Sequence, residues 1–300
     1  MVSLSVSPYF RFERFPIHFC IRLPEVIFSY YSCLSAVDEI VVFYIFLVIL
    51  STWGATALGA SAVFFVKEIN QRLMNGMFGF ASGVMLAASF WSLLLPSIAM
   101  SAELGWWPWF PPLCGFLAGG AFLWCIDKIL PHLHFGEHHT PEGVPANWRR
   151  SLLLLFALTI HKIPEGLAIG IAFGAAFAGM ESATLMGAVS LMIGLSIQSV
   201  PESAAVVLPL RTGGLSRFRC FLCGQFLGAV GTITAGIGAL LVTLVQVILP
   251  FALPFAAGAM FYVIIEELIP TSHQNENSDA GTIGAIIGFA IMMTLDIALG

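Results

Sequence analysis

Long apolar runs, separated by short segments rich in charge, Pro or Gly, constrain this 300-residue chain more than any other feature. A helix needs roughly 20 mostly apolar residues to cross the hydrocarbon core of a bilayer. Runs of that length lie at approximately 39–66, 73–100, 108–130, 150–177, 182–210, 218–248, 251–270 and 281–299. The connections between them leave no room for a soluble domain. We therefore expect an all-α polytopic membrane protein, with one eight-helix transmembrane bundle over residues 39–300.

Composition excludes other classes of protein. Apolar residues make up 58% of the chain and charged residues 10%, against about 25% charged residues in soluble domains. A nucleic-acid partner is not expected, because binding phosphates requires a basic surface. The six cysteines do not form the pattern of a secreted disulfide framework. The expected surroundings of the chain are the lipids of a bilayer.

Residues 1–38 differ from the rest of the chain. They mix Arg11, Glu13, Arg14, Arg22 and Glu25 with aromatic residues and Pro, and contain no apolar core of a signal peptide. We expect a poorly ordered N-terminal extension. A targeting role, or a start codon assigned too far upstream, is the alternative.

The basic residues predict the orientation of the bundle, because cytoplasmic loops carry an excess of Lys and Arg. The alternate connections at 101–107, 178–181 and 249–250 carry no basic residue. We therefore expect both termini to be extracytoplasmic or lumenal. The connections or helix ends on the other side carry Lys67, Arg72, Lys128, Arg149, Arg150, Arg211, Arg217 and Arg219.

Ionisable residues inside the apolar runs indicate a functional site. A charged side chain at the bilayer centre costs about 2.5–3.5 kcal/mol on insertion scales. Several carboxylates in one small bundle need a cation to neutralise them, so a cation site is favoured over simple polar packing between helices. The residues near mid-span are His161, Lys162, Glu165, Glu202, Glu266 and Glu267, while Asp127, Lys128 and Asp296 lie nearer the ends.

One pattern occurs twice, as HKIPEG at 161–166 and QSVPES at 198–203. Residues i and i+4 share a helix face, so His161 lies with Glu165, and Gln198 with Glu202. Two such faces turned toward each other provide nitrogen and oxygen ligands suited to a divalent ion such as Zn²⁺.

Each pattern contains a proline, Pro164 or Pro201. Proline removes a backbone hydrogen bond within a helix. Helices broken in this way are tolerated at membrane depth where they line a cavity, and they are typical of transporters. We expect the two central helices to be Pro-broken.

These motifs resemble the ZIP (Zrt/Irt-like) metal transporters, specifically the GufA-like branch. Supporting stretches are SGVMLAA at 82–88, DKILPH at 127–132, EELIP at 266–270 and MMTLDIALG at 292–300, so the resemblance covers about 39–300. It implies a ZIP-like bundle of eight transmembrane helices, often paired as homodimers. It also implies transport of Zn²⁺, Fe²⁺, Mn²⁺ or Cd²⁺ toward the cytoplasm and no enzymatic activity. By this resemblance the metal ligands are His161, Glu165, Gln198 and Glu202.

The chain departs from that branch at a second metal site. Relatives bridge two ions with the motif glutamates, and complete the second site with Asn after the His, Asp or Asn after the Gln, and an acid in the sixth helix. Lys162, Ser199 and Gly231 stand at those positions. We expect one metal, with the Lys162 ammonium in place of the second. In the alternative, Lys162 turns away and reaches toward the membrane surface.

Other residues are lesser candidates for the metal path. His132, His134, His138 and His139 lie in one predicted cytoplasmic connection, and a His-rich tract is typical of metal binding. They indicate a weak receiving site or a sensor, or else a solvated loop. Ser199, Glu266, Glu267 and Asp296 also belong to this group, with Glu267 expected to lie deeper than its neighbour Glu266.

The sequence leaves two other functions open. One is a metal-sensing relative that does not transport, since the second site is altered. The other is an intramembrane metallohydrolase, in which a metal activates water, although the chain has no HExxH motif. Mixed His, Glu and Gln ligands suit zinc, iron and manganese alike, and the topology rules hold in plasma and organelle membranes.

Overall fold

The computed structural model describes residues 39–66, 70–129, 150–180, 182–212, 214–244, 248–273 and 278–300. None of these residues lies in a β-strand. The chain divides into two units, Met1–Tyr44 and Ile45–Gly300. The second unit contains both motifs and the predicted spans from Ile45 on. Its elements are α2 (Glu39–Phe65, from Ile45 on), α3 (Gln71–Ala88), η1 (Ser89–Leu94), α4 (Leu95–Glu103), α5 (Phe110–Ile129), α6 (Arg150–Phe177), α7 (Leu185–Thr212), α8 (Arg217–Leu244), α9 (Leu249–Val263), η3 (Ile264–Leu268), α10 (Ile269–Ser272) and α11 (Ser278–Leu299).

These elements confirm the predicted fold class, an all-α polytopic bundle. Seven stretches in the described part of the chain are long and apolar enough to cross a membrane, and α6 is a further helix of 28 residues. Large apolar side chains such as Phe226, Ile233 and Ile286 are 54–64% exposed. Such exposure is costly in water and is expected where a helix faces lipid. The predicted spans match the helices within a few residues at most ends.

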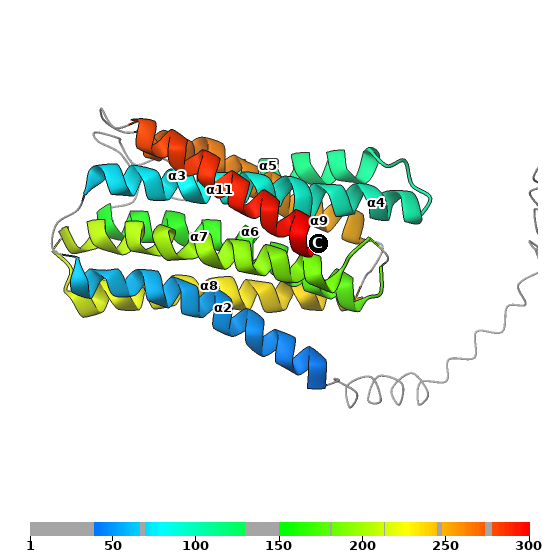
Figure 1. The fold of residues 1–300 in the computed structure, drawn as a ribbon, viewed down its shortest axis with the longest axis horizontal. Coiled ribbons are helices and arrows are strands. Elements are labelled where there is room, and N and C mark those ends of the chain that lie inside the picture. Colours follow the sequence, from blue (N-terminus) through cyan, green and yellow to red (C-terminus); the bar gives the residue numbers. More distant parts are fainter. Residues whose placement is uncertain are drawn as a thin grey trace, which may run out of the picture. The chain divides into compact units, whose positions relative to one another are not determined.

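The helices pack side by side as long pairs. Helix α11 runs along α3, α5 along α9, and α6 along α8, and Figure 1 shows α11 in red beside α3 in cyan. Helix α7 contacts α3, α6, α8 and α11, so it lies at the centre of this unit. The motif residues of α6 and α7 are therefore surrounded by other helices.

Glycine residues allow the two helices of each pair to pack closely. A Cβ atom at Gly83 of α3 would overlap the Ala285 carbonyl of α11, and one at Gly119 of α5 would overlap the Phe255 carbonyl of α9. Gly170 of α6 meets Ala235 of α8 in the same way. Small residues let transmembrane backbones approach, and van der Waals packing then replaces the hydrophobic effect that lipid cannot supply.

Two helices contain a π turn that was not predicted from the sequence. In η1 the Leu95 amide donates to the carbonyl of Phe90, and in η3 the Ile269 amide donates to that of Ile264. A proline follows each turn directly, at Pro96 and Pro270. A π turn contains one extra residue, so it shifts which side chains face inward.

One end of the unit carries the described basic residues other than Lys162. Helices α3, α6, α8 and α11 begin there, and α2, α5, α7 and α10 end there (Figure 1). Arg211 donates to the carbonyls of Val63, in the last turn of α2, and Val66, just beyond it, which gives partners to two carbonyls at this helix end. We call this the Arg211 end and the opposite end the Gly300 end.

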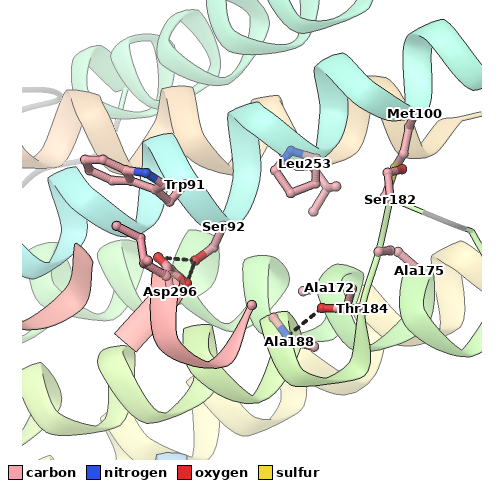
Figure 2. A pocket seen from close by; sticks show the side chains of 15 residues that line it. Trp91, Ser92, Met100, Ala172, Ala175, Ser182, Thr184, Ala188, Leu253 and Asp296 are labelled. Carbon is pink, nitrogen blue, oxygen red and sulfur yellow. Dashed lines mark hydrogen bonds between the residues drawn. The ribbon is translucent and has the colours of Figure 1, made fainter. Parts of the chain in front are cut away.

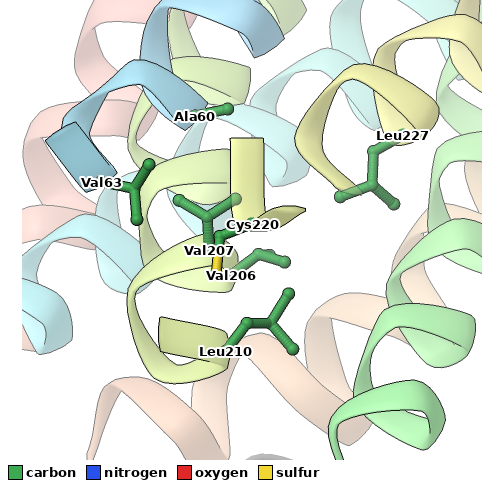
Figure 3. Close-up of a cluster of buried hydrophobic side chains, with 7 residues drawn as sticks. All are labelled: Ala60, Val63, Val206, Val207, Leu210, Cys220 and Leu227. Atoms are coloured by element: carbon green, nitrogen blue, oxygen red, sulfur yellow. The ribbon is translucent and has the colours of Figure 1, made fainter. Parts of the chain in front are cut away.

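Beside Arg211, an apolar cluster joins α2, α7 and α8. Figure 3 shows the side chains, and Cys220 is a fully buried part of this cluster. The other members are Ala60, Val63, Val206, Val207, Leu210 and Leu227. The cluster holds α7 and α8 against α2 close to the connection between them.

The glycine contacts predict a difference between two matched substitutions. Gly83→Ala should destabilise the protein by about 1–3 kcal/mol, because overpacking forces α3 and α11 apart. Gly236→Ala on α8 should leave stability unchanged or raise it, since nothing lies within 4 Å of the added Cβ and Ala favours helix. Thermal unfolding in detergent measures both, and equal melting temperatures would contradict this explanation of the pairs.

Candidate metal centre

The two motif segments lie on neighbouring helices and face the interior. Helix α6 continues through Pro164 and α7 through Pro201, and the two helices pack together. His161, Glu165, Gln198 and Glu202 are all at least 91% buried. The structure thus brings the four predicted ligands onto buried faces of the two helices that the repeat indicated.

The amine of Lys162 lies between the two motif glutamates. Its Nζ donates to Glu165 Oε2 at 2.6 Å, to Glu202 Oε2 at 2.5 Å and to Ser199 Oγ at 3.2 Å. An ammonium group has three protons, so each has a partner. Lys162 is 4% exposed and does not extend toward the membrane surface.

A small cavity adjoins this cluster. It has a volume of about 20 Å³, which is close to the space that one water needs. At Gly231 an added Cβ would meet only the Lys162 carbonyl, 4.0 Å away. Space therefore remains where the family resemblance predicts an acid in the sixth helix. Thr52, Thr56, Glu165, Gly166, Leu195 and Ser199 are among the lining residues.

His161 is held by a carboxylate from another helix. Its Nδ1 lies 3.1 Å from Glu267 Oε2, and Glu267 is 4% exposed. Glu267 belongs to η3, while the adjacent Glu266 is exposed. The two glutamates are therefore in different surroundings, and Glu267 is the one that reaches the motif residues.

Some polar atoms at this centre have no partner among the residues that the structure describes. Both amide atoms of Gln198 and Oε1 of Glu165 are buried without a hydrogen bond, and Gln198 is 0% exposed. An unsatisfied buried polar group costs about 1–3 kcal/mol. Oε1 of Gln198 and Oε1 of Glu165 thus keep lone pairs available, which is what a site for a cation requires.

The ligands do not yet form a cage for an ion. Within the described ranges, no three His, Cys, Asp or Glu side chains are grouped so that they could hold a metal. One oxygen of each motif glutamate is bonded to Lys162, and His161 is bonded to Glu267. Coordination therefore requires the ligands to come closer together, through atoms that these contacts do not use.

A larger cavity lies toward the Gly300 end, with a volume of about 300 Å³. Asp296 of α11 lines it and accepts hydrogen bonds from Ser92 of η1 at 2.8 and 2.9 Å (Figure 2). It also accepts one from Ser190 of α7 at 2.8 Å. Ser92 and Ser190 were not predicted from the sequence, because neutral hydroxyls in apolar runs give no charge signal. Trp91, Met100, Ala175, Thr184 and Leu253 complete much of the lining.

Some predicted residues lie outside the described ranges. They are the extension 1–38 and the histidines His132, His134, His138 and His139. Their proposed roles stay predictions.

The Lys162 contacts predict the behaviour of a charge-deleted variant. Lys162→Met should lower the stability of the metal-free protein by about 3–5 kcal/mol, because removing one partner leaves the other charges buried and unpaired. The triple variant Lys162→Met, Glu165→Gln, Glu202→Gln should recover most of that loss. Thermal unfolding in a metal chelator measures both. Wild-type stability of Lys162→Met would contradict the observed ion pairs.

The chain is similar to proteins that are described as zinc transporters. The family described as ZIP Zinc transporter matches residues 136–296. Zinc transporter ZIP11 of Homo sapiens is 36% identical, covering 83% of this chain and 95% of that protein. Zinc transporter GufA of Myxococcus xanthus is 32% identical over 82% of this chain and 95% of its own length. Zinc transporter ZIPB of Bordetella bronchiseptica is 34% identical over 83% of this chain and 79% of its own.

Proposed function

The chain belongs to the ZIP family of zinc transporters, and we propose that it carries Zn²⁺ through the buried centre on α6 and α7. It is a transporter and not an enzyme, which sets the metallohydrolase alternative aside. The proposed ligands are His161, Glu165, Gln198 and Glu202.

The observation that carries this proposal is the unpartnered amide of Gln198. A glutamine buried completely, with neither amide atom bonded within the described chain, is costly unless another group binds it. Glu165 Oε1 is in the same condition. A zinc ion binds side-chain oxygen atoms, so a cation between α6 and α7 would satisfy Oε1 of Gln198 and Oε1 of Glu165.

The position of the Lys162 amine supports the proposal that the centre binds one ion. Its ammonium is bonded to one oxygen from each motif glutamate, which are the atoms that would bridge two metals. The adjoining cavity of about 20 Å³ has room for about one water. A fixed positive charge also repels an entering cation, so zinc should bind more weakly than at a two-metal centre and leave more readily.

The direction proposed is from the Gly300 end toward the Arg211 end. Basic residues at the Arg211 end indicate the cytoplasmic side. At the opposite end, Asp296 gives the cavity of about 300 Å³ a carboxylate, which would attract a cation before it reaches α6 and α7. Transport of Fe²⁺, Mn²⁺ or Cd²⁺, and pairing as a homodimer, stay predictions from the family resemblance.

Uptake of radioactive Zn²⁺ into proteoliposomes tests the function. The wild-type protein should show uptake, and Gln198→Ala should lower it at least tenfold, since no described contact depends on that amide. Glu165→Ala with Glu202→Ala should reduce it to background. Glu103→Ala, at an exposed helix end, is the control. A folded wild-type protein without uptake would favour the metal-sensing alternative.

Elemental analysis tests the number of ions. The wild-type protein should bind one zinc per chain at this centre. The triple variant Lys162→Asn, Ser199→Asp, Gly231→Glu should bind two, because it restores the second set of ligands and Gly231 has room for a side chain. Two zinc ions in the wild-type protein that are lost together on mutating Glu165 and Glu202 would rule out the role given to Lys162.

A further inference from the structure

Glu267 contacts the proposed zinc ligand His161 from a helix that carries neither motif. The carboxylate belongs to η3, and its Oε2 lies 3.1 Å from His161 Nδ1. Glu267 is 4% and His161 9% exposed. The contact is thus shielded from solvent, where a hydrogen bond to a carboxylate is strong.

The π turn explains how Glu267 reaches this position. The Ile269 amide donates to the carbonyl of Ile264, five residues back. Pro270 has no amide proton and follows at once. In this wide turn Glu267 lies buried and Glu266 exposed. The backbone of η3 thereby selects one of two adjacent carboxylates for His161.

The chemistry of imidazole gives this contact a consequence for zinc. A neutral imidazole has one N–H and one nitrogen with a free lone pair. With a carboxylate oxygen at Nδ1, the proton belongs on Nδ1, which leaves the lone pair on Nε2. Carboxylates that accept the second N–H of a ligating histidine fix its tautomer and orientation and make the other nitrogen a better donor to metal.

We propose that Glu267 is a positioning residue that acts on zinc through His161. This inference rests on the proposed function in one respect, that His161 binds the ion. Glu267 accepts the Nδ1 proton and presents Nε2 for coordination, while α6 and α7 supply the ligands themselves. The stretch EELIP therefore has a role distinct from that of a direct ligand on the metal path.

A positioning role for Glu267 predicts how strongly substitutions of Glu267 and Glu266 weaken zinc binding. Loss of such a carboxylate typically costs 10–100-fold in metal affinity, so Glu267→Gln should weaken zinc binding about tenfold or more. Glu266→Gln removes the same charge from the exposed neighbour and should weaken binding much less than Glu267→Gln. Glu267→Asp keeps a carboxylate and should fall between the wild type and Glu267→Gln.

A double-mutant cycle separates positioning from direct ligation. Zinc affinity is measured by competition with a chelating dye, on detergent-solubilised wild type, Glu267→Gln, His161→Ala and the double variant. If Glu267 acts through His161, Glu267→Gln should have no further effect once His161 is Ala. An equal loss in both backgrounds would show that Glu267 binds zinc directly and would overturn the inference.

The cycle also distinguishes failure of the inference from failure of the proposed function. His161→Ala with wild-type affinity would show that His161 is not a ligand, and would overturn that assignment together with the inference. Weakened binding in His161→Ala with additive effects would overturn the inference alone. Melting temperatures check folding, and if Glu267→Gln does not fold, Glu267→Asp replaces it in the same cycle with the same criteria.

Discussion

The Lys162 ammonium, bonded to Glu165 and Glu202, is the interaction on which the rest of the centre depends. Two carboxylates buried side by side repel each other strongly where the dielectric is low, and each loses the hydration that it had in water. A cation tethered to α6 offsets both costs in the absence of zinc. Within the described chain, Oε1 of Glu165 and Oε1 of Gln198 stay without partners. One ammonium offsets only one of the two carboxylate charges, so the cluster can still bind a cation.

Close helix packing makes these short contacts possible. Gly166 follows Glu165 directly, and a Cβ there would overlap Thr234 and the carbonyl of Gly231 on α8. The absence of that Cβ lets α8 approach α6 at the level of the motif. The family resemblance predicts an acid where this chain has Gly231, and we propose that Lys162 takes the place of the second ion that such an acid would bind. Relative to the pattern that the resemblance predicts, Lys162 adds one positive charge and Gly231 removes one negative charge. Both changes make the centre more positive, in place of the two charges of a second divalent ion.

The sequence predicted the spans and the motif faces well, because both result from strong constraints. Hydrocarbon thickness sets helix length, and the cost of burying charge singles out His161, Glu165 and Glu202. The sequence predicted that Glu267 lies deeper than Glu266, but not its contact with His161, because that contact belongs to a π turn that has no clear pattern beyond a following proline. The hydroxyls of Ser92 and Ser190 were missed since neutral residues cost little in an apolar run. The fold and the family are confirmed, while the ligand set stays a proposal.

The location of bound zinc tests the central claim most directly. Anomalous scattering at the zinc edge, from crystals grown with zinc, locates each ion relative to its ligands. We predict one peak at the centre, about 2.0–2.2 Å from His161 nitrogen and from motif carboxylate oxygen, with Lys162 still bonded between Glu165 and Glu202. Two peaks bridged by these glutamates, or a single peak in the position of the Lys162 ammonium, would contradict the claim.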